Sequence, residues 1–445
     1  MGLIIDNGLV ISGDAERHIW PRGAVAMEGD RIVRVGPREE VVRAYPGFER
    51  RDAGGMAVLP GLVNGHSHTA LSVLRGMVED VGRRSLHRIY FPFMELMTEE
   101  DVEVMASLGC LETVKSGTTC LVELYSGLDP ILEAVDRVGC RAVAGEMIRD
   151  VDLLGIRDGD YRFDPRMRDD MLRQGMETVD KWHGRGRGRI QCLLSPLAPD
   201  MCSAGFLKEV RELAEKSDLR VHTHLDQSPV EVEQVLAREG MRPAEFLESV
   251  GLVGPRLTAA HCFLAAEREI EILGQSGTNV AHCSGIAARR GYSPPIPALK
   301  KAGANVCLGS DNMTGDMMET MRLALMIGRI VSGDDTALPS AEVLEMATMG
   351  GARAVGLDTE IGSLEAGKKA DLVLLDMKKP HLEPVINPVA GLVHYGLASD
   401  VDTVMVGGRV IMADRSFRTI DEEAVMSRAR QTAKRLWKEF ERRKR

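Results

Sequence analysis

The pattern of hydrophobic and polar positions changes twice along the chain. Residues 1 to about 55 hold short apolar runs separated by turn residues, and Asn7–Gly8 and Gly29–Asp30 stand between such runs. This spacing predicts β-hairpins rather than helices. From about residue 358 the same short runs return, with a turn at Gly407–Gly408.

Between these ends, apolar strand-like runs alternate with amphipathic helix-like stretches. One helix is expected to begin after Thr98, which with Asp101 forms a capping pattern, and to end at Gly117. Eight runs have the character of strands: 57–68, 118–125, 141–148, 189–197, 219–226, 256–262, 278–285 and 305–312.

Eight strand–helix alternations predict a parallel sheet covered by helices, and eight is the number that closes a (β/α)8 TIM-type barrel. A doubly wound open sheet is the alternative, but it needs a glycine-rich phosphate turn after the first strand, and "GLVNGHSH" is not one.

Three parts of the chain follow from this α/β pattern. We expect a small β-sandwich domain assembled from both termini, residues 1–56 and 358–417, and a barrel over residues 57–357. Residues 418–445 should form a charged amphipathic helix.

The amino-acid composition limits the possible binding partners of the protein and the cell compartment in which we expect it. The formal net charge is −10, which argues against nucleic acid or an anionic membrane as a partner. No segment is long and apolar enough to cross a bilayer. The eight cysteines form no CxxC pair and mostly sit in apolar runs, so we expect reduced core thiols in a cytoplasmic protein.

Histidines gather at the ends of the expected strands. Two positions apart on one strand, His66 and His68 point the same way. Six of the 11 histidines and one aspartate end such strands: His66, His68, His222, His224, His261, His282 and Asp311. Because strand ends converge on one mouth of a barrel, these side chains predict a site for a divalent cation such as Zn²⁺.

The chain resembles the amidohydrolase superfamily, within the group of methylthioadenosine/S-adenosylhomocysteine deaminases and triazine hydrolases. Three segments carry the resemblance over nearly the whole length: "LPGLVNGHSHTALSVLRG", "GTTCLVELY" and "IGSLEAGKKADLVLLD".

The resemblance implies roles for particular residues. It assigns four metal ligands, which are His66, His68, His224 and Asp311. It also implies that Asp311 accepts a proton from the attacking water, and that His261 polarises the substrate or handles the proton of that water. No lysine ends a strand where binuclear members carry a carboxylated one, so one metal is expected. Zn²⁺ is the first choice, and Fe²⁺ or Mn²⁺ suit the same ligands.

Two segments depart from the group's deaminases. Those enzymes carry a glutamate three residues after the third metal histidine, and here Gln227 holds that place. A carboxamide forms hydrogen bonds but shuttles no proton at neutral pH. Asp226 is adjacent and should face away on a regular strand. Leu197 replaces a histidine that helps to hold nucleoside substrates.

Further pocket residues are expected from the resemblance and from position. Arg75 and Glu95 are implied as substrate contacts, together with Gln227. His282 begins "HCSGIAARRG", which places Arg289 and Arg290 near the barrel mouth. Arg290 is then expected to bind an anionic or polar group of the substrate. His222 is expected to support another histidine rather than the metal.

The leading hypothesis is hydrolysis of a C–N bond other than a peptide bond by a metal-activated hydroxide. The reaction would be deamination, or displacement of a similar leaving group, on a small N-heterocycle. Two alternatives stay open: a hydrolase of ureas, carbamates or cyclic amides, and a catalytically silent metal-binding ligand sensor. The resemblance also implies a homo-oligomer with a small-molecule substrate.

Overall fold

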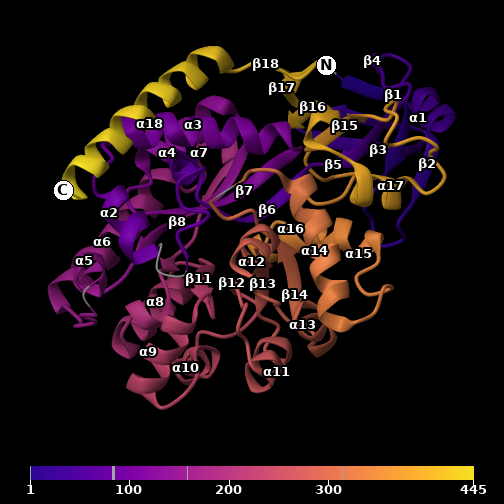
Figure 1. The fold of residues 1–445 in the computed structure, drawn as a ribbon. Helices are drawn as coiled ribbons and strands as arrows, with labels where there is room; N and C mark the ends of the chain where they lie inside the picture. The colour runs from indigo at the N-terminus through magenta and orange to yellow at the C-terminus, as the bar shows by residue number, and fades with distance from the viewer. Residues whose placement is uncertain (1, 83–85, 158, 313, 445) are drawn as a thin grey trace.

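The computed structural model describes residues 2–82, 86–157, 159–312 and 314–444. Strands from both ends of the chain form one nine-stranded, mostly antiparallel sheet, which lies at the upper right of Figure 1. From the N-terminal part come β1 (Gly2–Ile11), β2 (Ile19–Glu28), β3 (Arg31–Pro37), β4 (Glu49–Asp52) and β5 (Met56–Pro60), with the short helix α1 (Arg38–Ala44). From the C-terminal part come β15 (Leu372–Asp376), β16 (Val401–Val406), β17 (Arg409–Ala413) and β18 (Ser416–Phe417).

Pairing of β5 with β15 joins the two ends of the chain in that sheet. One apolar cluster contains side chains from both parts, including Ile5, Val25 and Leu374. The expected composite β domain is therefore observed. The expected turns at Gly29–Asp30 and Gly407–Gly408 connect β2 to β3 and β16 to β17.

The expected hairpin at Asn7–Gly8 is wrong. Strand β1 runs through both residues, and its register with β2 shifts between Ile5 and Gly8. Asn7 adopts a left-handed φ of 65°, which an asparagine tolerates within a bulge as well as in a turn. The dipeptide therefore bends the strand without ending it.

The barrel consists of parallel strands in two hydrogen-bonded groups, and its strands follow the expected runs. The first group contains β6 (Leu62–Ser67), β7 (Thr118–Tyr125), β8 (Arg141–Ile148), β9 (Ile190–Cys192) and β10 (Ser195–Pro196). The second contains β11 (Val221–Leu225), β12 (Leu257–His261), β13 (Asn279–His282) and β14 (Asn305–Leu308).

Two parallel bridges close these groups into a barrel. Leu194 pairs with Val221 at one junction, and Ser67 pairs with Asp311 at the other. Since β9 and β10 occupy one position between β8 and β11, eight strand positions complete the circle. The (β/α)8 prediction is confirmed.

Helices surround the barrel, as Figure 1 shows. Thr98 and Asp101 form the expected capping box of α3, which ends just before Ser116 and Gly117. The main covering helices are α3 (Glu99–Lys115), α4 (Asp129–Val138), α6 (Pro165–Trp182), α8 (Ala204–Lys216), α9 (Pro229–Glu239), α10 (Pro243–Ser249), α11 (Glu267–Gln275), α13 (Ile296–Ala302), α14 (Met317–Ser332), α15 (Ser340–Met346) and α16 (Met349–Val355). Shorter segments near the mouth and the junctions are η1 (Thr69–Leu74), η2 (Leu86–Tyr90), α2 (Phe91–Met94), α5 (Leu153–Arg157), α7 (Arg185–Gly188), η3 (Pro199–Met201), α12 (Ser284–Arg290), α17 (Pro388–Tyr395) and η4 (Ala398–Asp400).

The change from sheet to barrel falls between β5 and β6. We expected one strand from residue 57, but Met56–Pro60 belongs to the terminal sheet and Leu62–Ser67 to the barrel. Gly61 separates them and approaches Thr119 so closely that a Cβ there would lie 2.0 Å from Thr119 Oγ1. The sequence pattern did not separate the two strands, because both are buried and together they form one continuous apolar run.

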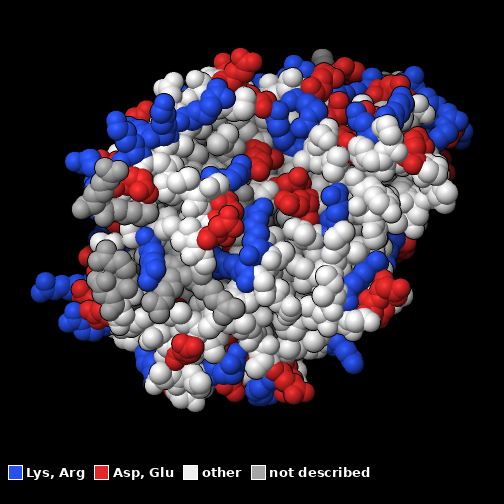
Figure 2. All heavy atoms as spheres, viewed as in Figure 1, with Lys and Arg blue, Asp and Glu red and all other residues white. Residues whose placement is uncertain are grey.

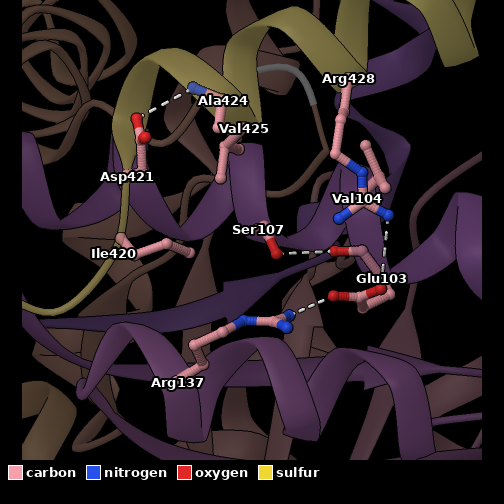
Figure 3. Close-up of a pocket in the computed structure, with 9 residues that line it drawn as sticks. All are labelled: Glu103, Val104, Ser107, Arg137, Ile420, Asp421, Ala424, Val425 and Arg428. Atoms are coloured by element: carbon pink, nitrogen blue, oxygen red, sulfur yellow. Dashed lines mark hydrogen bonds and ion pairs between the residues drawn. The ribbon is translucent and has the colours of Figure 1, made fainter.

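The C-terminal helix α18 (Glu422–Lys444) packs along α3 on the outside of the barrel (Figure 1). Figure 3 shows Arg137 from α4 and Arg428 from α18 pointing toward Glu103 of α3. Trp437 donates a hydrogen bond from Nε1 to the Val73 carbonyl at 2.9 Å and packs against Phe93. The helix is therefore held by both ion pairs and aromatic packing.

Lys and Arg side chains gather along α18 at the upper left of Figure 2, while both signs are mixed over the rest of that face. Several of these cations pair with carboxylates, as Arg435 does with Asp101 and Arg442 with Glu439. Within the described ranges, no helix has both the length and the apolar character that crossing a membrane requires.

A buried ion pair joins the barrel to the terminal sheet. Arg141 at the start of β8 donates from Nε to Asp371 Oδ2 at 2.9 Å and from Nη2 to Oδ1 at 3.1 Å. The Gly407 amide also donates to Asp371 Oδ1 at 2.7 Å. Both charged side chains are almost fully buried, so each depends on the other for its charge compensation.

We therefore predict that Asp371→Asn lowers the free energy of unfolding by about 3 kcal/mol, because it leaves the Arg141 charge buried and unpaired. Asp376→Asn is the matched control, since Asp376 pairs with Lys379 at the surface and such pairs contribute at most about 1 kcal/mol. Thermal and denaturant unfolding of both variants measures the difference. Equal losses in the two variants would contradict a special role for the buried pair.

Candidate metal centre and active site

The carboxyl ends of four barrel strands bring the predicted ligands together. His66 lies within β6 and His68 directly follows that strand, whereas His224 lies in β11. His261 ends β12, and Asp311 follows β14. The backbone fixes Asp311 against the first strand, because its amide donates to the His66 carbonyl at 2.9 Å and its carbonyl accepts from the His68 amide at 3.2 Å.

Donor atoms of these side chains converge on one small volume. Nε2 of His68 lies 3.3 Å from Nε2 of His224 and 3.7 Å from Oδ1 of Asp311. In His66, His68 and His224, one possible ligand atom of each side chain lies within 4.8 Å of the other two. The same holds for one atom each of His66, His261 and Asp311. Three imidazoles and a carboxylate at this spacing are a donor set that fits a divalent metal ion.

The second ring nitrogen of each histidine supports this fit. Nδ1 of His68 lies 2.6 Å from the Leu124 carbonyl, and Nδ1 of His224 lies 2.7 Å from the Leu197 carbonyl. A carbonyl accepts only, so each Nδ1 carries the proton and each Nε2 presents a lone pair. Nε2 of His66 is buried and has no hydrogen-bond partner within the described chain.

His222 contacts the second ring nitrogen of His66. Its Nε2 lies 3.0 Å from Nδ1 of His66, and the two rings stack with centroids 5.1 Å apart. The expectation that His222 stands behind a ligand, rather than beside the metal, agrees with this geometry.

Burial keeps the imidazoles of His66, His224 and His261 neutral. Burial, together with the neighbouring imidazoles, lowers the pKa of His66 and His261 well below the usual value. It lowers the pKa of His224 to about 3. Neutral imidazole is the form that coordinates a metal, so the lone pairs are available at physiological pH.

Burial also raises the pKa of the Asp311 carboxyl, while His68 and Arg290 act against that shift. The backbone at the same rim is strained: φ is 79° at His261, 49° at Cys262 and 63° at Asp311. Left-handed conformations of residues other than glycine are costly and cluster at functional sites.

Glu123 is a buried carboxyl that the sequence analysis missed. It lies in β7, accepts from the Thr69 amide at 2.9 Å and from Ser67 Oγ at 3.1 Å, and thus holds the residues on both sides of His68. Burial raises the pKa of Glu123 to about 8. Its signal in sequence was only a charged residue inside an apolar strand, "TTCLVELY".

A small, partly open cavity lies beside the metal-ligand cluster. Its polar side chains come from several strand ends and from η2 and α12: His68, Tyr90, His224, Gln227, His261, Arg290, Asp311 and Asn312. Its apolar lining residues are Leu71, Phe91, Met94, Met147, Leu197 and Met201. A lining of apolar side chains with a few polar groups is typical of a small-molecule site.

The structure places three of the predicted substrate contacts outside this lining. Arg75 forms an ion pair with Glu112 and lines a separate small recess next to His68. Glu95 is exposed at the end of α2. His282 is buried, and neither ring nitrogen has a partner among the described residues.

Asp226 does not take the place of the missing glutamate. It follows β11 with φ of 51°, and its buried carboxylate lies 3.9 Å from Arg242 rather than in the cavity lining. Glu231 accepts from the amides of both Asp226 and Gln227 at 2.9 Å, which fixes the backbone that carries Gln227.

Comparison with known proteins agrees with this geometry. The model of the amidohydrolase family matches residues 57–411, and a bacterial imidazolonepropionase-like composite domain matches residues 23–47. A 5-methylthioadenosine/S-adenosylhomocysteine deaminase of Desulforudis audaxviator is 39% identical over 93% of this chain and 95% of its own length.

Solved structures show the same fold. An adenosine deaminase from Xanthomonas campestris with bound zinc superposes with a TM-score of 0.89 and 29% identity, covering 98% of each chain. Atrazine chlorohydrolase TrzN from Arthrobacter aurescens TC1 has a TM-score of 0.89 at 23% identity, covering 97% of this chain and 100% of its own, and supports the fold alone. With a matching family model over most of its length and a relative of this identity, the chain belongs to the amidohydrolase family.

Proposed function

We propose that this protein is a hydrolase that holds one Zn²⁺ ion and removes an amino group, or a similar leaving group, from a small N-heterocycle. The observation that carries the proposal is the convergence of His66, His68, His224 and Asp311 beside a cavity lined by both apolar and polar side chains. The names of the deaminase relatives, and the zinc in one of the similar structures, support the reaction and the ion.

In this proposal the three histidines and Asp311 hold the ion through the atoms that face one another. When bound, such an ion acts as a Lewis acid that lowers the pKa of water toward neutrality. The Nδ1 hydrogen bonds to the carbonyls of Leu124 and Leu197 keep the rings of His68 and His224 oriented.

Asp311 moves the proton. One carboxylate oxygen lies 3.7 Å from His68 Nε2, and the other lies 4.0 Å from His261 Nε2. Because the carboxylate lies beside the imidazoles that would hold the ion, it is placed to accept the proton of the attacking water. It then passes that proton to the leaving nitrogen.

His261 orients the reacting groups. Its Nε2 faces Asp311 and its ring packs against His224 at a centroid distance of 5.3 Å. As a neutral imidazole, it can hydrogen-bond the attacking oxygen or the ring atom that gains negative charge. Gln227 hydrogen-bonds the heterocycle, and its carboxamide transfers no proton.

Gln227 also favours a second candidate function, the hydrolysis of ureas, carbamates or cyclic amides. These reactions place the developing charge on a carbonyl oxygen, where hydrogen-bond donors are sufficient. Ammonia release from uncharged aminated heterocycles, compared with turnover of ureas and cyclic amides, separates the two candidates.

We further propose that the protein works in the cytoplasm as a homo-oligomer. All eight cysteines are free and buried, as expected in a reducing compartment. Ile330 on α14, Ile386 before α17 and Tyr395 at its end are exposed apolar side chains that a second copy could cover.

Replacing one histidine of the cluster should remove the metal. We predict that purified wild-type protein contains about one transition-metal ion per chain and that His224→Ala contains almost none, because the loss of one ligand from this set weakens binding of the ion. The control is His18→Ala, since His18 with Asp14 and Glu16 forms a second group of possible metal ligands, nearer the surface. Elemental analysis measures both, and loss of metal in the control alone would refute the assignment.

Restoring an acid at position 227 should accelerate deamination of uncharged substrates. We predict that Gln227→Glu raises the rate of ammonia release from uncharged aminated heterocycles by about 100-fold, because a positioned acid–base group contributes on that order. Gln227→Leu, which has no hydrogen-bonding group, serves as the comparison variant. A slower reaction in the glutamate variant would instead assign an essential contact to the carboxamide.

A further inference from the structure

The charges lining the cavity are unevenly balanced. Among its described lining residues, Asp311 is the only carboxylate and Arg290 the only permanent cation, while burial keeps His224 and His261 neutral. With the divalent ion of the proposed function in place, positive charge exceeds negative charge in this cavity. Gln227 contributes to the imbalance, since a glutamate there would supply a second negative charge.

Arg290 is one of the residues that line the cavity beside the metal-ligand cluster. It is the last residue of α12 and is half-buried. His224, His261 and Asp311 line the same cavity as Arg290. Tyr90 lies next to Arg290, and burial raises the pKa of Tyr90 to about 12, so its hydroxyl stays protonated.

No carboxylate of the described residues lies within ion-pair distance of Arg290, whereas two other arginines near the barrel have such a partner. Arg242 pairs with Glu269 at 2.6 Å and Arg75 pairs with Glu112. A partly buried guanidinium beside a metal centre is costly unless an anion compensates it.

We propose that Arg290 binds a carboxylate of the substrate, so that the substrate is an N-heterocycle with an anionic group near the carbon that is attacked. The assignment rests on the proposed function for the metal and the reaction. A guanidinium binds a carboxylate through two parallel hydrogen bonds, and the Tyr90 hydroxyl is a further donor at the same end of the cavity. The methionines and Leu197 then contact the uncharged face of the ring.

This inference accounts for the departure at Gln227 and for the position of Arg290 in the cavity. Arg290 adds a positive charge, and Gln227 removes a negative charge, on the same cavity. Both features raise the local electrostatic potential, and both favour a substrate with an anionic group near this end of the cavity.

Ligands that bind directly to the metal ion test whether Arg290 binds a carboxylate. They can be used before the heterocycle of the substrate is identified. Benzohydroxamate chelates a bound zinc ion, and its ring isomers with a carboxylate or an uncharged carboxamide differ only in the anionic group. We expect the zinc-loaded wild type to bind the best-placed carboxylate isomer about 10- to 100-fold more tightly than the matched carboxamide in calorimetric titration.

Variants test which residue causes the preference for the carboxylate isomer. Arg290→Met should abolish it without weakening the unsubstituted hydroxamate, and Gln227→Glu should reduce it by adding a negative charge. Arg289→Met is the matched control, because the neighbouring arginine is exposed and does not line the cavity. If Arg290→Met does not fold, the wild type and Gln227→Glu still give the comparison.

Three results would overturn the proposal. One is equal binding of carboxylate and carboxamide isomers by the wild type. Another is an equal loss of preference in Arg289→Met and Arg290→Met. Failure of the unsubstituted hydroxamate to bind would contradict the metal centre, and with it both the proposed function and this inference.

Discussion

The parallel bridge between Ser67 and Asp311 is the constraint on which the site depends. It closes the barrel, and the same backbone hydrogen bonds place Asp311 between the carbonyl of His66 and the amide of His68. Residues that are more than two hundred positions apart in sequence therefore meet because a sheet has no free edge. Closure of the barrel therefore sets the positions of the ligand residues, and their side chains supply the atoms that can bind a metal ion.

Support for the cluster comes largely from backbone atoms and buried acids. The carbonyls of Leu124 and Leu197 orient two imidazoles, and Glu123 holds the segment on both sides of His68. Such groups fix the tautomer and direction of a ligand without contacting the metal. The cavity wall, by contrast, consists of methionines and other apolar side chains that can adapt to a ring.

The barrel, the composite sheet and the convergence of the histidines could be predicted from sequence, because periodicity and strand ends report directly on topology. The membership of the family was confirmed by comparison. Tertiary contacts were harder to predict. Asn7–Gly8 forms a bulge, Arg75 is held by Glu112, and Tyr90 enters the cavity from a segment that has no motif. None of these outcomes has a local sequence signal, since each depends on a neighbour distant in the chain.

The junction of β5 with β15 has a consequence for synthesis of the protein. Strand β5 leaves the ribosome long before β15, its antiparallel partner, has been translated. Until then the N-terminal strands expose an unpaired edge and the apolar residues that later meet Leu372 and Leu374. Exposed edges of this kind invite pairing with other chains. Completion of the terminal sheet is thus a late step, and a nascent chain needs protection from aggregation until its last third has emerged.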